Sequence, residues 1–204
     1  MKDGVWSPAD QTGALWSPAM SGGAGEAASR LVDRVADGDL GALELLYRQH
    51  HEPVRAFARR LLGNASVAED LVHEVFLAAP AALRNYRGES EVRTFLLSVA
   101  VNKAKHHLRA ASRFRRALGR LGGEPRPAPA APPDEATERR ELCDELQRAL
   151  DQLPIEQRVV VILCAVEERT AREAAEIVGA PENTVRTRLF HAKRKLREIM
   201  GGEP

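Results

Sequence analysis

One stretch of the chain carries basic side chains and no acidic ones. Residues 101–120 contain seven lysines and arginines and not a single aspartate or glutamate. On a helix, steps of three and four place one set of residues on a single face: Asn102, Lys105, Arg109, Arg113, Arg116 and Arg120. A merely solvated face usually interleaves acids that form i,i+4 pairs with its bases, and none occurs here. The stretch therefore predicts a helix that contacts a phosphate backbone.

A second basic cluster, near the C-terminus, follows the pattern of a helix–turn–helix. Thr170 and Glu173 have capping-box spacing and predict the start of a short helix, and Gly179 predicts its end. A second helix is expected from about Glu182. Its buried seam is predicted to be Val185, Leu189, Ala192, Leu196 and Ile199, and its opposite side carries Asn183, Thr187, Phe190, His191 and Arg194. A short helix, a tight turn and a basic second helix are an arrangement that reads the major groove.

The composition excludes several other classes of protein. Thirty basic and 29 acidic residues nearly balance over 204 residues, which excludes a polybasic tail protein and an acidic disordered activator. No run of about 18 apolar residues is present, and the N-terminus lacks a secretory pattern, so we expect a cytoplasmic protein. Cys143 and Cys164 fit no metal-ligand spacing. We interpret both as reduced core thiols, with a redox switch as the less favoured alternative.

The sequence contains no recognisable catalytic motif. It has no phosphate-binding Gly-Lys-Ser/Thr loop, no His-Glu-x-x-His motif and no nucleophile elbow. The adjacent pairs His50–His51 and His106–His107 would point about 100° apart on a helix, so neither pair readily holds one metal ion. We therefore expect a protein that is not an enzyme, with no catalytic residues, no metal site, no cofactor and no small-molecule substrate.

Helical periodicity accounts for most of the N-terminal half. Apolar residues recur at three- and four-residue steps from Arg30, and Gly63 supplies a stop. Ser66–Glu69 has capping-box spacing and predicts the next helix, whose apolar stripe is Leu71, Val72, Val75 and Phe76. Pro80 is expected to end or kink that helix. A loop follows, and then a long helical stretch to about Leu118.

Two segments differ from the rest in composition. Residues 122–134 hold five prolines, two glycines and no large apolar side chain, which predicts a solvated linker. The first 29 residues are rich in glycine and carry a short tryptophan-containing repeat, Val5–Ala9 and Leu15–Ala19. They predict a disordered extension, with a pair of Trp anchors for a partner groove as the alternative.

These patterns together predict an all-α protein with two small helical domains. The expected divisions are a disordered extension over 1–29, a helical bundle over 30–121, a flexible Pro-rich linker over 122–137 and a helix–turn–helix domain over 138–200. No strand is expected. Although the formal net charge is only +1, the chain is therefore expected to have two basic surfaces, one in each domain.

The spaced motifs resemble the extracytoplasmic-function class of bacterial sigma factors, the smallest class of the primary-sigma family. The resemblance covers about residues 30–120 and 138–200, and the motifs occur in the family's order. The matching motifs are, for region 2.2, Glu69–Phe76; for regions 2.3 and 2.4, Tyr86–Ser90, Arg93–Phe95 and Val101–Asn102; and for region 4, Leu153–Arg158 and Asn183–Leu189. Several motifs in order are far more specific than a helix–turn–helix alone.

The resemblance implies a function and particular residue roles. It implies a sigma factor that binds core RNA polymerase and directs promoter recognition, melting of the −10 element and initiation of transcription. The residues implied to face the clamp helices of the polymerase β′ subunit are Asp70, Leu71, Glu74 and Phe76. Those implied to bind the −10 element are Tyr86, Arg87, Gly88, Ser90, Phe95, Asn102, Lys105 and Arg109. Those implied to bind the −35 element are Arg172, Asn183, Thr184, Arg186, Thr187, Phe190 and His191.

The same resemblance implies further partners. These are promoter DNA, the polymerase β flap and a cognate anti-sigma factor, which can hold the protein at the membrane when it is not active at the nucleoid. The chain departs from the family pattern at several positions. His73 stands where the family usually has Gln, Pro80 where it has Trp, and Phe95 where it has Trp. Glu167–Thr170 lacks the Gly common before the helix–turn–helix, and Ala171 replaces a frequent Tyr.

The alternative is a stand-alone helix–turn–helix regulator that binds DNA without polymerase. The N-terminal half discriminates between the two hypotheses. A plain regulator needs neither the surface at Asp70–Phe76 nor the loop from Tyr86 to Phe95. That loop has few apolar side chains to bury, so we expect it to be exposed.

Overall fold

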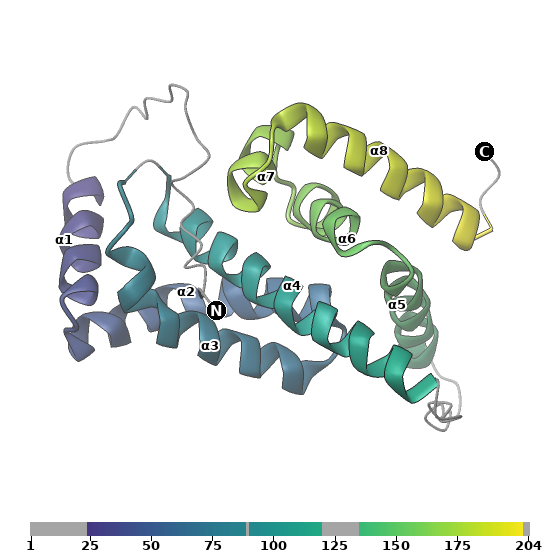
Figure 1. Ribbon diagram of the computed structural model, residues 1–204, viewed down its shortest axis with the longest axis horizontal. Helices are drawn as coiled ribbons and strands as arrows, with labels where there is room; N and C mark the ends of the chain where they lie inside the picture. The colour runs from purple at the N-terminus through teal and green to yellow at the C-terminus, as the bar shows by residue number, and fades with distance from the viewer. Residues whose placement is uncertain (1–23, 89, 120–134, 202–204) are drawn as a thin grey trace.

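The computed structural model describes residues 24–88, 90–119 and 135–201, and all regular structure in them is helical (Figure 1). The elements are α1 (Ala24–Ala36), α2 (Leu40–Leu62), α3 (Ala65–Leu83), α4 (Val92–Gly119), α5 (Glu135–Asp151), α6 (Ile155–Val161), the one-turn π-helix η2 (Ile162–Val166), α7 (Ala171–Val178) and α8 (Glu182–Ile199). The expected all-α fold, in two helical halves, is confirmed. The Trp repeat and most of the predicted linker lie outside the described residues.

Two predicted boundaries are wrong by a few residues. Helix α1 already begins at Ala24, inside the segment expected to be disordered up to residue 29. The segment Ala24–Ala28 has three alanines, the best helix former, with Glu26 favourably placed in the first turn. Helix α5 begins at Glu135, so residues 135–137, expected to belong to the linker, are helical.

Helices α1 to α4 form the first bundle, with α1 packed on α2 and α3, and α2, α3 and α4 packed on one another. Gly63 ends α2 as predicted, in the left-handed conformation (φ 66°), and its N–H donates to the carbonyl of Arg59. The predicted capping box at Ser66 is wrong, because α3 starts one residue before it. Asn64 has extended backbone angles and accepts a hydrogen bond from the N–H of Val67 at 3.1 Å, so it is the N-cap.

Helix α3 also continues beyond the proline that was expected to end or kink it. Pro80 lies inside α3, which runs three residues further to Leu83. A proline removes one backbone hydrogen bond within a helix. Ala79 and Leu83 on either side are buried in the core, so packing of this last turn offsets the lost bond.

Helix α4 lies at the centre of the molecule. Eight consecutive residues, 94–101, are all buried, although a helix on a surface buries only one face. Helices α2 and α3 pack on one side of α4, and α7 and α6 pack on another (Figure 1). The residues that surround this segment therefore come from both halves of the chain.

Helices α5 to α8 make the second half. Thr170 and Glu173 form the predicted capping box, and the hydrogen bonds that the Thr170 N–H and hydroxyl donate hold the pKa of Glu173 below its usual value. Gly179 ends α7 in the left-handed conformation, and α8 begins at Glu182 as expected. Val185 and Ala192 of the predicted seam are fully buried.

The two halves share one core instead of having separate ones. A single cluster of buried apolar residues runs from Val32 in α1 to Val185 in α8. A smaller cluster, made of Leu150, Leu153, Val161 and Ala192, joins α5, α6 and α8. The predicted flexible linker implies two independent bodies, whereas in this structure α4 and α7 bury apolar surface against each other.

A strained residue precedes the helix–turn–helix. Glu168 adopts a left-handed backbone (φ 54°), which is unfavourable for a side chain with a Cβ by about 1–2 kcal/mol. We expect Glu168→Gly to raise the free energy of unfolding by up to about 1 kcal/mol, because the gain exceeds the extra entropy of glycine in the unfolded chain. Urea denaturation checks this, provided that the slope of the unfolding free energy against urea concentration is the same for both proteins. Glu168→Ala keeps a Cβ and should give no such gain; an equal gain from alanine would contradict the strain argument.

Candidate polymerase and promoter-DNA interface

The outward face of α3 differs from the one expected. Asp70 is exposed and Glu74 is partly exposed, as predicted for a polymerase contact. Leu71 is 0 % exposed and Phe76 only 5 %, so the prediction that they face a partner is wrong: both are core residues. Leu77, which no sequence pattern singles out, is 79 % exposed. Residues 70, 74 and 77 step by four and three, so they share one helix face.

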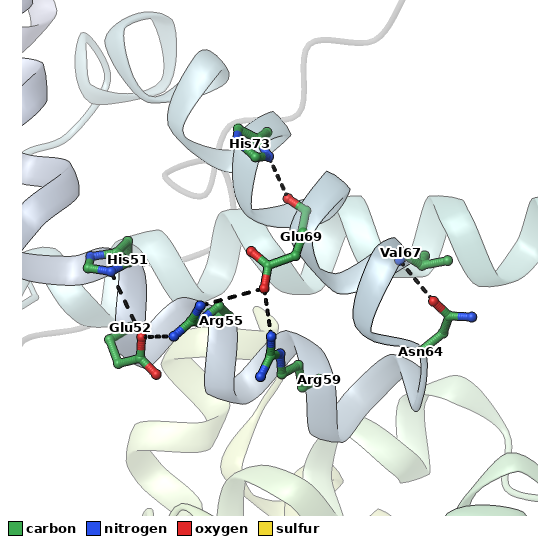
Figure 2. Close-up of polar contacts among 8 residues, drawn as sticks. All are labelled: His51, Glu52, Arg55, Arg59, Asn64, Val67, Glu69 and His73. Carbon is green, nitrogen blue, oxygen red and sulfur yellow. Dashed lines mark hydrogen bonds and ion pairs between the residues drawn. The ribbon is translucent and has the colours of Figure 1, made fainter.

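Ion pairs fix the surroundings of this face, as Figure 2 shows. Glu69 accepts a hydrogen bond from Arg59 at 2.8 Å and lies 3.7 Å from Arg55, which also binds Glu52. The ring nitrogen Nδ1 of His73 lies 2.9 Å from the carbonyl oxygen of Glu69. The Glu69 carboxylate is therefore tied to α2, whereas that of Asp70 on the next residue points to solvent.

An open hollow of about 530 Å³ lies between α3 and α4. Each of its lining residues carries a polar or ionisable group: Glu74, Asn102, Lys103, His106 and His107. Glu74 lies 3.0 Å from Nε2 of His107 and 3.5 Å from Nζ of Lys103. The Asn102 amide donates to the carbonyl of Ser98 at 2.9 Å. The hollow thus joins a residue expected at the polymerase to one expected at the −10 element.

The loop that precedes α4 is exposed at its tip and anchored at its base. Arg87 and Gly88 are exposed, and Gly88 has a left-handed backbone (φ 73°) that suits glycine. The hydroxyl of Tyr86 donates to the carbonyl of Ser90, and burial raises the pKa of that tyrosine. Phe95 is 6 % exposed and packs edge-on against Tyr86, with ring centroids 5.1 Å apart. The expected exposed loop is correct for its tip, but Phe95 supports it from the core and does not line its surface.

The basic stripe of α4 meets the second half of the chain. Lys105 is half-buried near Glu156 and Arg188, and burial lowers its pKa. Arg109 lies 3.5 Å from Glu156 of α6. The predicted side chains Arg113 and Arg116, and Arg120, lie outside the described part of the chain. Of the basic residues of the stripe whose side chains are described, Lys105 is therefore half-buried near the second half, and Arg109 pairs with α6 while its side chain stays 63 % exposed.

The predicted −35 residues gather on one open face. On α8 the exposed members are Asn183, Arg186, Thr187, Phe190 and His191, and Thr184 is partly buried. Phe190 is 60 % exposed and packs edge-on against His191 at 5.5 Å between ring centroids. Arg172 of α7 is exposed beside Glu176 at 3.9 Å. An aromatic ring and a guanidinium on a solvent-facing helix suit apolar and hydrogen-bonding contacts with base edges.

The described residues contain neither a candidate metal site nor a helix that could cross a membrane. In residues 24–88, 90–119 and 135–201, no group of three or more His, Cys, Asp or Glu side chains is placed to hold a metal ion. None of the helices in these ranges is long and apolar enough to cross a membrane.

A helix–turn–helix with an exposed, polar second helix, joined to a second helical bundle, is an arrangement that suits a DNA-binding protein. Residues 46–114 match the family model described as Sigma-70 region 2, and residues 143–196 match Sigma-70, region 4. The chain is 30 % identical over 171 residues to RNA polymerase sigma-H factor of Pseudomonas aeruginosa, covering 80 % of this chain and 89 % of that protein. It is 32 % identical over 171 residues to RNA polymerase sigma factor CarQ of Myxococcus xanthus, covering 83 % and 95 %.

A third relative specifies the class. The ECF RNA polymerase sigma-E factor of Escherichia coli is 30 % identical over 172 residues, which cover 80 % of this chain and 88 % of that protein. The chain belongs to the extracytoplasmic-function sigma factors of the sigma-70 family. It is an alternative sigma factor that binds core RNA polymerase and promoter DNA and directs the initiation of transcription. The stand-alone regulator is not favoured, because the N-terminal half matches region 2 as well.

Two solved structures share the fold. CnrH, in complex with the cytosolic domain of CnrY, aligns with a TM-score of 0.60 at 24 % identity, covering 86 % of this chain and 97 % of that one. The sigma factor RpoE of Bartonella quintana, in complex with the anti-sigma factor NepR, aligns with a TM-score of 0.58 at 22 % identity, covering 79 % and 98 %.

Proposed function

We propose that the exposed face of α8 reads the −35 element of the promoter. The observation that carries this role is the placement of Arg186, Thr187 and Phe190 on the solvent side of α8, while Val185 and Ala192 fix its opposite side in the core. The capped α7 and the left-handed turn at Gly179 set the angle at which α8 leaves. Such a second helix enters the major groove with its N-terminal residues towards the bases. Arg172, Asn183, Thr184 and His191 complete the proposed contact set.

The outer face of α3 is the proposed contact for the polymerase β′ clamp helices. Asp70 and Glu74 supply carboxylates, and Leu77 supplies an exposed apolar side chain between polar neighbours. An apolar centre with a charged rim is the usual composition of a protein interface. Leu71 and Phe76 act in this proposal by holding α3 in place. Helices α1–α4 serve as region 2 and α5–α8 as region 4, whose proposed partner is the polymerase β flap.

The loop tip and the start of α4 are the proposed site for the −10 element. Arg87, Gly88 and Ser90 surround the tip, and Asn102, Lys105 and Arg109 follow along α4. A base that leaves the stack costs a few kcal/mol, so the protein must offer it new contacts. The exposed tip, anchored by the bond from Tyr86 to Ser90, supports such a role. Tyr86 and Phe95 shape the site from beneath.

Regulation by a cognate anti-sigma factor is part of the proposal. The two similar structures are complexes with NepR and with the cytosolic domain of CnrY, and their shared fold supports a similar partner for this chain. Such a partner would keep the chain in the cytoplasm near the membrane when it is tethered there. Sigma factors in general are not enzymes, and we propose that this chain has no catalytic activity of its own.

A double variant tests the −10 site. We expect Arg87→Ala with Asn102→Ala to lower the permanganate reactivity of thymines in the −10 element about tenfold, because contacts to the extruded base are lost. Binding to core polymerase should not change, since both residues lie off the α3 face. The promoter is one selected from random DNA with the wild-type holoenzyme.

A template with an already melted bubble provides the control. There the cost of unstacking has been removed beforehand, so the variant should recover most of its activity. An equal defect on duplex and bubble templates, or wild-type reactivity on the duplex, would show that this loop does not open DNA.

A further inference from the structure

One acidic side chain stands at the edge of the open side of α8. Helices α5, α6 and α7 pack on one side of α8, and its other side borders solvent (Figure 1). Over residues 182–193 the helix carries three lysines and arginines but only one acid, Glu182. Glu182 is the first residue of the helix, and its side chain is 41 % exposed. A helix proposed to enter the major groove therefore carries a carboxylate at the end that lies nearest the bases.

Only one oxygen of the Glu182 carboxylate is used within the chain. Its Oε1 accepts two hydrogen bonds from the Arg186 guanidinium, from Nε at 3.0 Å and from Nη2 at 2.6 Å. No donor in residues 24–88, 90–119 or 135–201 bonds to the other oxygen, Oε2. A carboxylate only accepts hydrogen bonds and has about four lone-pair sites. Glu182 therefore keeps an open acceptor on the surface of α8.

Glu182 lies beside the residues proposed to read the −35 element. Steps of four place Glu182, Arg186 and Phe190 along one side of the helix. Asn183 and Thr187 follow the same step next to them, and all four of these neighbours are exposed. The motif that resembles the sigma family begins at Asn183, one residue later. Glu182 thus belongs to the same surface, although the resemblance gives it no role.

A carboxylate in the major groove restricts which base can lie opposite it. Because it only accepts hydrogen bonds, it is repelled by the acceptors O6 and N7 of guanine and O4 of thymine. The amino groups of cytosine and adenine can donate to it, but adenine places its acceptor N7 beside the amino group. Cytosine presents its amino group, N4, with no acceptor of its own on the same edge. Cytosine is therefore the base that suits a carboxylate best.

We propose that Glu182 determines specificity, by selecting cytosine at one position of the −35 element through a hydrogen bond from N4. This inference rests on the proposed −35 role of α8. The pair with Arg186 is exposed and weak, so the guanidinium can turn to a guanine when DNA arrives. The carboxylate is then left among phosphates unless a base donates to it. Glu182 and Arg186 lie about 6 Å apart along the helix axis, and successive base pairs about 3.4 Å apart, so the cytosine belongs to a different base pair from that guanine.

Holoenzyme binding to promoters with each of the four bases at every −35 position tests the proposal. The starting promoter is the one that the unmutated holoenzyme selects from random DNA, and cytosine should be preferred at one of its −35 positions. Glu182→Ala should lower that preference about tenfold, because nothing remains to accept from N4. Glu182→Gln should shift the preference at the same position towards adenine, because a glutamine amide pairs with adenine N6 and N7. An acid that only stabilises the start of the helix would not change the preferred base.

Glu198→Gln is the matched control. It removes the same charge from an exposed residue in the last turn of α8, which pairs with Arg194 of the same helix at 3.6 Å. Loss of a negative charge near phosphates should strengthen binding to DNA of unrelated sequence in both glutamine variants. Only Glu182→Gln should also change the preferred base, whereas Glu198→Gln should keep the preferences of the unmutated chain at every position.

Arg186→Ala, measured on the same promoters, separates this inference from the proposed function of α8. If Arg186→Ala changes the −35 preferences and neither Glu182 variant does, cytosine selection by Glu182 is wrong and the −35 role of α8 stands. If the Glu182 variants act only at the base pair where Arg186→Ala acts, Glu182 positions Arg186 and does not select cytosine. If none of the three variants changes any preference, the −35 role of α8 is wrong as well.

Discussion

Leu71→Ala is expected to lower the free energy of unfolding by about 2–5 kcal/mol, and Leu77→Ala by less than about 0.5 kcal/mol. Both substitutions remove the same atoms from the same helix and change helix propensity equally. Only their surroundings differ, since Leu71 is fully buried and Leu77 is 79 % exposed. The difference therefore measures core packing alone. Urea denaturation of both variants gives the two values.

The loss of affinity for core polymerase should follow the opposite order, larger for Leu77→Ala than for Leu71→Ala. Leu77→Ala should weaken association with core polymerase about tenfold, as expected when a central apolar side chain of an interface is truncated. The affinity of Leu71→Ala is measured at a urea concentration low enough to leave the variant folded. It should be within about twofold of that of the unmutated chain. A stable Leu71→Ala that fails to bind polymerase would show that Leu71 contacts polymerase directly, although it is buried in the free chain.

Helix ends and helix faces could be predicted from the sequence because both depend on near neighbours. The capping box of Thr170 and Glu173 and the left-handed Gly63 and Gly179 involve residues within one turn of each other. The sequence pattern misplaces the cap of α3 because two residues that can cap a helix, Asn64 and Ser66, stand two positions apart. Either could start a helix, and local pattern alone does not choose between them.

The misassignment of Leu71 and Phe76 has a different origin. Helical periodicity already placed both on the apolar stripe of α3, and the structure buries them there. The resemblance to the sigma family identifies the motif that contacts polymerase, but not which of its residues point outward. Where a family motif and a helical period disagree about one side chain, the period decides its orientation.

The packing of the two halves could not be predicted from the linker composition. A Pro-rich linker permits separate bodies but does not require them. The relevant signal is in the sequence of α4, where nearly every residue from Phe95 to Val101 is apolar, on all sides of the helix. A helix that is apolar all round needs cover on all sides. The partner that supplies the cover, α7, is about 70 residues away, beyond the reach of any local pattern.

Arg186→Ala is expected to lower discrimination at the −35 element by about 1–3 kcal/mol, which is about a 5- to 150-fold change in the ratio of affinities. The Arg186 side chain is 65 % exposed and pairs with Glu182 one turn earlier, at 2.6 Å. Exposed i,i+4 pairs contribute only about 0.3–0.5 kcal/mol, so DNA can displace Glu182 at little cost. The measurement compares holoenzyme binding to the selected promoter and to variants with altered −35 bases.

Arg197→Ala separates base recognition from simple charge. Arg197 lies on the same helix, eleven residues later, so it points in nearly the same direction about 16 Å further along the axis. If Arg186 contacts a base, Arg186→Ala should reduce the differences in affinity among promoters with altered −35 bases. Arg197→Ala should leave these differences unchanged. If Arg186 contacts only phosphate, its loss should weaken all sequences equally and reduce the salt dependence by about one counterion. That second outcome, with an unchanged ranking, would remove Arg186 from the recognition set and leave Phe190, Thr187 and Asn183 to carry the specificity of α8.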